Sequence, residues 1–171
     1  ERQIQTGKCY ILRCAASSTV LLPFHKLSSF ICSCVCSGRD KQRRPIIVVH
    51  VRRHDPSMQS KDELTRFGVH ILERGSERLQ DVPADDEGSA SSSSEFCIIF
   101  NLEGIALSNV DLNAAKRIIY MLTNFYPERM GVCLMVGAPV LFSAAWQIIR
   151  PWLAPNTQHK INFCNSSELS K

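Results

Sequence analysis

The fold is decided by residues 96–138, which read FCIIFNLEGIALSNVDLNAAKRIIYMLTNFYPERMGVCLMVGA. Two continuous apolar runs, 96–102 and 132–138, enclose a segment in which apolar residues recur every three or four positions. Apolar runs without polar alternation are typical of strands buried on both faces, and the recurrence is typical of an amphipathic helix. The stretch therefore predicts strand, helix and strand, the repeating unit of a parallel sheet.

The helix in this unit has two distinct faces. Its apolar stripe consists of Ala115, Ile118, Ile119, Leu122, Phe125 and Tyr126. The opposite face, predicted to meet solvent, carries Asn113, Lys116, Arg117, Tyr120 and Asn124. Tyr126-Pro127 is expected to end the helix, because the residue before a proline disfavours helical backbone.

The pattern continues on both sides of this unit. Upstream, 45–51 is a β-branched run that predicts a strand, and Ser60 with Glu63 forms a capping signature that opens a predicted helix over 60–79, with Gly68 and Gly75 as its weak points. Downstream, 143–153 predicts a further helical stretch and 159–164 a short fourth strand. We expect one α/β domain with a mainly parallel sheet and helices packed around both faces.

Two segments do not fit this pattern. Residues 1–38 show no sustained period, so we predict an atypical or poorly ordered segment there, ahead of a domain over 39–171. Residues 81–95 are acidic and serine-rich, which predicts a flexible surface loop.

Charge is unevenly distributed along the chain. The net charge is +7 over residues 1–56, −5 over 57–95 and +2 over 96–171. A basic amino-terminal third suits an anionic partner or is simply a solvated face, and charge alone does not choose. Nucleic acid is not expected as the partner, because the arginine cluster has no nucleic-acid-binding motif and no interleaved aromatic residues.

Eight cysteines do not predict a disulfide framework in a chain of this size. We expect reduced thiols in the cytoplasm, with Cys97, Cys133 and Cys164 acting as small buried hydrophobes. A thiolate metal site at Cys32, Cys34 and Cys36 is a weaker hypothesis, because the second ligand cluster typical of zinc sites is missing, and no metal is expected.

No stretch reaches the length of a spanning helix, and the first residues do not resemble a cleaved signal.

Residues 101–164 resemble the CRAL-TRIO family of lipid carriers. Four blocks in the family's order and spacing carry the resemblance: NLEGIALSN (101–109), YPERMG (126–131), VGAPVLFSAAWQIIRPWL (136–153) and APNTQHKINF (154–163). The resemblance implies a sheet floor and helical walls around an apolar cavity that shields acyl chains. The family's preceding helical domain, terminal strand and gating helix are not recognisable here, so the resemblance implies a truncation at both ends.

The resemblance also implies site residues. Glu128, Thr157 and Lys160 match the positions that hold the headgroup in members that bind phosphatidylinositol; the alternative for Glu128 and Lys160 is an ordinary surface ion pair. Expected cavity-lining residues are Phe125, Trp146 and Ile149, which could equally fill a core. The basic residues expected to face a membrane are Arg43, Arg44, Arg52 and Arg53.

The expected function follows from these residues. We predict a monomeric, peripheral carrier that binds and transfers a phospholipid, phosphatidylinositol first among the candidates, without a cofactor. The alternative is a membrane-sensing or protein-interaction module of a larger regulatory protein. An enzyme is not expected, because the nucleophile elbow, zinc helix, P-loop and dinucleotide-binding turn are all missing from the sequence.

Overall fold

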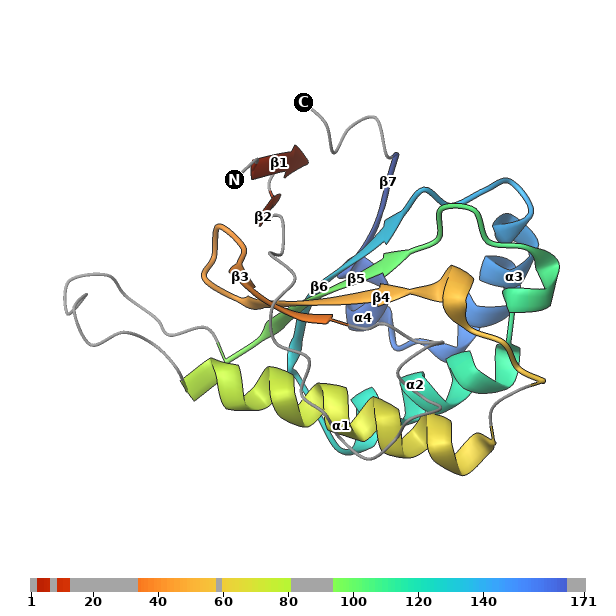
Figure 1. The fold of residues 1–171 in the computed structure, drawn as a ribbon, viewed down its shortest axis with the longest axis horizontal. Helices are drawn as coiled ribbons and strands as arrows, with labels where there is room; N and C mark the ends of the chain where they lie inside the picture. The colour runs from red at the N-terminus through yellow and green to blue at the C-terminus, as the bar shows by residue number, and fades with distance from the viewer. Residues whose placement is uncertain (1–2, 7–8, 13–33, 58–59, 81–93, 166–171) are drawn as a thin grey trace.

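The computed structural model describes residues 3–6, 9–12, 34–57, 60–80 and 94–165. It confirms an α/β fold built on a five-stranded sheet of order β3-β4-β5-β6-β7 (Figure 1). The strands are β3 (Cys34–Arg39), β4 (Pro45–His50), β5 (Phe96–Asn101), β6 (Met130–Val136) and β7 (Ile161–Cys164). All neighbours in β4 to β7 are parallel, and β3 pairs antiparallel with β4 at one edge.

Helices connect the parallel strands. They are α1 (Lys61–Gln80), α2 (Leu112–Asn124), α3 (Phe142–Ile149) and α4 (Pro155–His159), with short 3-10 turns η1 (Val51–Arg53), η2 (Leu107–Asn109) and η3 (Arg150–Trp152). In Figure 1, α1 and α2 run side by side beneath the sheet, and α3 lies at the end where β5 and β6 finish. No helix in the described part of the chain is long and apolar enough to cross a bilayer.

The two faces of the sheet have different coverings. Ile47, Ile98 and Cys133 cluster with helix residues such as Leu72 and Met121. The opposite face holds its own cluster, and its described members all come from strands: Ile46, Val48, Cys97, Ile99, Val132, Leu134, Val136 and Cys164. The described helices therefore cover only one face of the sheet, and the prediction of helices over both faces is wrong for this part of the chain. Because the strand order β4-β5-β6-β7 never reverses, right-handed crossovers place successive helices on the same face.

Helix α1 begins as predicted. The Ser60 Oγ accepts from the Glu63 backbone N–H at 3.2 Å, and the Glu63 carboxylate accepts from the Ser60 N–H at 3.0 Å. Gly68 and Gly75, predicted as weak points of this helix, are sites of close approach to other elements. A Cβ at Gly68 would lie 2.7 Å from the Met121 Cε, and one at Gly75 would lie 2.8 Å from the Ile47 Cδ1. The two glycines let α1 pack closely on α2 and the sheet.

The sheet begins before the predicted boundary at residue 39, because β3 starts at Cys34. Within residues 1–38, β1 (Gln3–Thr6) and β2 (Cys9–Leu12) also form an antiparallel hairpin. The predicted loop 81–95 lies outside the described residues except for Ser94 and Glu95. The side chains of Cys32, Cys34 and Cys36 lie outside them as well, and the described residues contain no group of three potential metal ligands.

Candidate functional site

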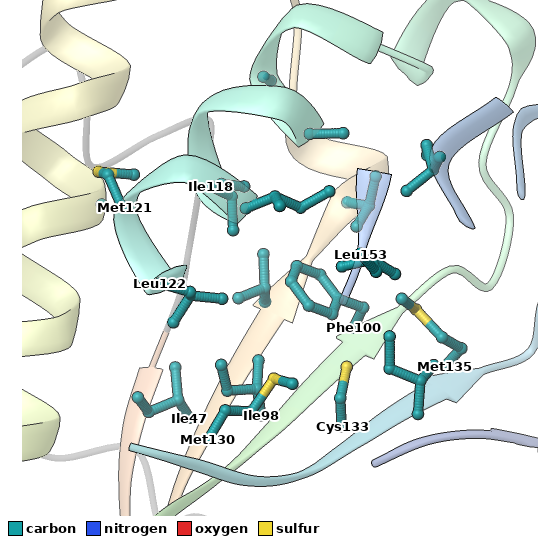
Figure 2. Close-up of a pocket in the computed structure, with 18 of the residues that line it drawn as sticks. Ile47, Ile98, Phe100, Ile118, Met121, Leu122, Met130, Cys133, Met135 and Leu153 are labelled. Carbon is teal, nitrogen blue, oxygen red and sulfur yellow. The ribbon is translucent and has the colours of Figure 1, made fainter. Parts of the chain in front are cut away.

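A cavity of about 400 Å³ lies between the sheet and the helices. Alternate strand residues form its floor: Ile47, Val49, Ile98, Phe100, Cys133 and Met135. Helix residues form its walls, among them Phe67, Ile71, Ala115, Ile118, Leu122, Trp146 and Ile149. Figure 2 shows the Ile118 and Leu122 side chains of α2 facing Ile98 and Phe100 across this space. Its volume lies within the range of small-molecule pockets, and its lining is mostly apolar, as such pockets usually are.

The three predicted cavity residues have different positions. Trp146 and Ile149 line the cavity from α3, and the Trp146 ring meets Phe163 edge to face with centroids 5.2 Å apart. Phe125 is 65% exposed and packs against Tyr120 instead, so its prediction as a lining residue is wrong. Because α2 ends at Asn124, the helical stripe does not continue to Phe125, and the buried side chain of Tyr126 turns into the cavity.

Tyr126 anchors the cavity wall to α1. Its hydroxyl donates a hydrogen bond to Glu73, and the phenol lies among apolar residues. Burial first, and then the hydrogen bond to Glu73 and its charge, raise the pKa of Tyr126 to about 12. The phenol therefore stays protonated and keeps donating at physiological pH.

Three charged side chains form a cluster at the edge where the parallel strands begin, which we call the amino rim: Glu95, Glu128 and Lys160. The Lys160 Nζ lies 3.1 Å from the Glu128 Oε2 and 3.4 Å from the Glu95 Oε1. Partial burial lowers the pKa of Lys160, but the hydrogen bonds that it donates to Glu128 and Glu95, and the charges of both carboxylates, outweigh burial and raise the pKa overall. Thr157, on α4, lines the cavity beside Lys160.

The rim forms because each residue sits just before or near the start of a parallel strand. Glu95 directly precedes β5, Glu128 lies two residues before β6, and Lys160 directly precedes β7. Glu128 adopts a left-handed backbone with φ 55°, which turns the chain sharply into β6. The structure thus brings the predicted residues Glu128, Thr157 and Lys160 to one place at the cavity lining.

A second polar group lines the cavity near the other ends of the strands. The His54 Nε2 lies 3.2 Å from the Asp111 Oδ2, and the Asp111 Oδ1 caps α2 by accepting from Asn113 and Ala114 N–H groups. Burial raises the pKa of Asp111, but the Ala114 N–H, His54 and the Asn113 N–H outweigh it and lower the pKa overall. The pKa of His50 is lowered by burial and by Arg53 and Arg52, so its ring favours the neutral form.

The comparisons with known proteins agree with this geometry. The family model described as "CRAL/TRIO domain" matches residues 32–171. The chain belongs to the CRAL/TRIO family. The crystal structure of Sfh5 shares the fold with a TM-score of 0.60 at 16% identity, over 78% of this chain and 46% of that one.

One of the curated relatives of this CRAL/TRIO chain is named as a transfer protein. "Phosphatidylinositol transfer protein CSR1" of Eremothecium gossypii is 30% identical over 76% of this chain and 28% of its own length. A CRAL-TRIO domain-containing protein of Schizosaccharomyces pombe is 29% identical over 95% and 29%, respectively. "SEC14 cytosolic factor" of Candida glabrata is 36% identical over 44% and 26%. The chain thus spans less than a third of the length of each of these relatives.

The four arginines predicted to face a membrane are not equivalent in the CRAL/TRIO fold. Arg44 is buried, with its Nε 2.6 Å from the Asp40 Oδ2, so its prediction as a membrane-surface residue is wrong. The turn that joins the antiparallel strands β3 and β4 directs the Arg44 side chain inward. Arg43 is exposed before β4, whereas Arg52 and Arg53 are exposed after it, about 20 Å away at roughly 3.3 Å per strand residue. They do not form one patch.

Sequence reasoning did not identify Glu95 or the His54–Asp111 pair. Glu95 was included in the acidic, serine-rich segment, yet its place directly before an apolar strand could have put it on the rim beside Glu128 and Lys160. Asp111 stands immediately before a helical stripe, which is the position of an N-cap residue.

The predicted burial is confirmed for Cys97 and Cys133, and burial raises the pKa of the Cys133 thiol to about 12. Cys164 is half-buried.

Proposed function

We propose that this chain binds one phospholipid, phosphatidylinositol, in its cavity and transfers it between membranes as a peripheral, monomeric protein of the cytoplasm. The observation that carries the proposal is an apolar cavity whose lining includes an ammonium group, Lys160, at one edge of the sheet. Each methylene that moves from water into such a space contributes roughly 0.8 kcal/mol, so an acyl chain is held mainly by the apolar walls. The names of two relatives support the choice of lipid and the cytosolic setting.

In this proposal the amino rim holds the headgroup. Lys160 donates to the phosphodiester, Thr157 offers its hydroxyl, and Glu128 accepts from inositol hydroxyls while it orients Lys160. An ammonium has three N–H bonds, and the carboxylates of Glu95 and Glu128 accept two of them, so that one can be directed to a ligand. Neither a metal nor a cofactor has a part in this binding mode.

Replacement of Lys160 by methionine should weaken phosphatidylinositol binding at least about tenfold, because a charge-assisted hydrogen bond to the phosphate contributes roughly 1.5–3 kcal/mol and each 1.4 kcal/mol is a factor of about ten. The measurements are transfer of labelled phosphatidylinositol between vesicles and native mass spectrometry of the purified protein. Lys61→Met, on the exposed first turn of α1, is the matched control. If the protein neither carries nor transfers a phospholipid, the proposal fails; vesicle pelleting without extraction would favour the sensing or interaction module instead.

We further propose that the end of the molecule beyond β4 faces the membrane. Arg52 and Arg53 are exposed there, and the Arg52 carbonyl accepts from Asn109 of η2, which also carries the exposed Leu107. Val140, in the turn before α3, is 91% exposed. Ile105 and Phe142, just beneath these two loops, share one buried cluster. Exposed aliphatic side chains flanked by arginines suit an anionic bilayer surface.

The double variant Arg52→Glu/Arg53→Glu should lower pelleting with anionic vesicles about tenfold or more, since each basic residue near such a surface contributes roughly 1 kcal/mol. The effect should shrink as salt is raised. Lys61→Glu/Arg66→Glu makes the same charge change on the exposed surface of α1 and should leave pelleting unchanged. If Arg43→Glu weakens pelleting and the double variant does not, the opposite end of β4 docks.

A further inference from the structure

Glu95 is the less exposed of the two carboxylates that bind Lys160. Its side chain is 34% exposed, compared with 82% for Glu128 and 26% for Lys160. The Glu95 Oε1 lies 3.4 Å from the Lys160 Nζ, and Glu95 itself does not line the cavity. A partly buried carboxylate interacts more strongly with a neighbouring charge than an exposed one, because less water screens it.

The second oxygen of Glu95 lies over Gly131, close to the side chain of Arg44. A Cβ built on Gly131 would lie 2.5 Å from the Glu95 Oε2 and 2.8 Å from the Arg44 Nη1. Both side chains therefore converge over Gly131, in space that only a glycine leaves open. Arg44 is itself fixed by the buried Asp40. Glu95 therefore lies between the Arg44 side chain, over Gly131, and the Lys160 ammonium.

Glu128 is placed differently. It sits on the exposed turn before β6, and water screens most of its carboxylate, which is 82% exposed. Arg129, in the same turn, directs its Nη1 to the Ser94 carbonyl at 3.1 Å. The rim thus presents one ammonium, Lys160, to two carboxylates, of which Glu95 is the more buried.

We propose that Glu95 is a specificity-determining residue that limits the affinity for anionic headgroups by competing with the lipid phosphate for Lys160. The inference rests on the proposed function of the amino rim. A headgroup with a net negative charge adds to the negative charge of the rim, whereas a zwitterionic headgroup brings a cation that can pair with Glu95. A moderate affinity for phosphatidylinositol permits its release at a membrane. It also permits replacement of the bound phosphatidylinositol by a zwitterionic lipid.

The wild-type protein and the Glu95→Gln variant are each incubated with vesicles that contain equal amounts of phosphatidylinositol and phosphatidylcholine. The lipids bound to each protein are then extracted and quantified. Glu95→Gln should raise the ratio of bound phosphatidylinositol to phosphatidylcholine about fivefold, which is the size of one partly exposed charge interaction. Glu95→Asp keeps the charge and should stay near the wild-type ratio. Glu77→Gln, which removes an exposed carboxylate on α1, should not change it.

An unchanged ratio in Glu95→Gln, or an equal loss of both lipids, would overturn the inference and leave the proposed function standing. Binding of neither lipid by the wild type would overturn the proposed function and the headgroup preference together. NMR titration of the Lys160 side chain without lipid then tests the pairing alone. A lower pKa of Lys160 in Glu95→Gln supports it, and an identical pKa refutes it.

Discussion

Ile118→Trp is expected to reduce phospholipid binding about 100-fold while the protein stays folded. Ile118 faces the cavity from α2 opposite Ile98 and Phe100 (Figure 2), so a larger ring at this position occupies space that acyl chains would need. Exclusion of only four methylenes costs roughly 3 kcal/mol, which is about two orders of magnitude in affinity. The measurement is the amount of lipid retained per protein after incubation with vesicles, together with the thermal unfolding midpoint.

The matched control for this variant is Ile148→Trp. Ile148 is on α3, is about half exposed and does not line the cavity, so the same substitution there should leave lipid binding intact. Ile149→Trp fills the cavity from a different helix. A similar loss of lipid binding in this variant would show that the effect of Ile118→Trp is not a local packing defect at Ile118. Full lipid binding by both cavity-filling variants would show that the lipid, if bound, lies elsewhere.

Asp40→Ala is expected to destabilise the protein by about 3–5 kcal/mol, the usual cost of leaving one partner of a buried ion pair alone. The Asp40 side chain is 1% exposed. Its Oδ2 accepts from the Arg44 Nε at 2.6 Å, and its Oδ1 accepts from the Gln42 and Arg44 N–H groups, each at 2.9 Å. These bonds close the turn that joins β3 to β4. Chemical denaturation of the variant and the wild type measures the difference.

Two further variants distinguish the cost of an unpaired buried charge from the cost of losing a carboxylate. Asp62→Ala, in the exposed first turn of α1, should cost less than about 1 kcal/mol. The double variant Asp40→Leu/Arg44→Met should recover part of the loss, because an apolar pair leaves no buried charge unpaired. If Asp40→Ala proves as stable as the wild type, the buried pair of Asp40 and Arg44 would contribute nothing measurable to stability, and the prediction would be wrong.

Much of the fold was predictable because its signals are local. The capping pair Ser60–Glu63 marked the start of α1, and continuous apolar runs marked β4, β5 and β6 to within about two residues. The prediction for Phe125 failed because helical periodicity does not show where a helix stops. α2 ends one residue too early for Phe125 to reach the wall.

The charged residues were harder to assign because their roles depend on partners that are distant in the sequence. Arg44 and Arg43 are adjacent and chemically identical, yet one is buried on Asp40 and the other is exposed. Glu95 and Lys160 are 65 positions apart, and only the parallel pairing of the strands they precede brings them together. A count of charges along the chain showed neither relation.

The sequence by itself determined the parallel strands β4 to β7, the helices α1 to α3 and the resemblance to the family, because hydrophobic periodicity, capping and motif spacing are properties of short segments. Only the tertiary structure decided that a cavity is left between the helices and the sheet. That outcome depends on the distance between α1, α2 and the strands, which contacts at Gly68 and Gly75 set over long separations. The same packing decided which carboxylates meet Lys160, since strand register fixes that meeting in space.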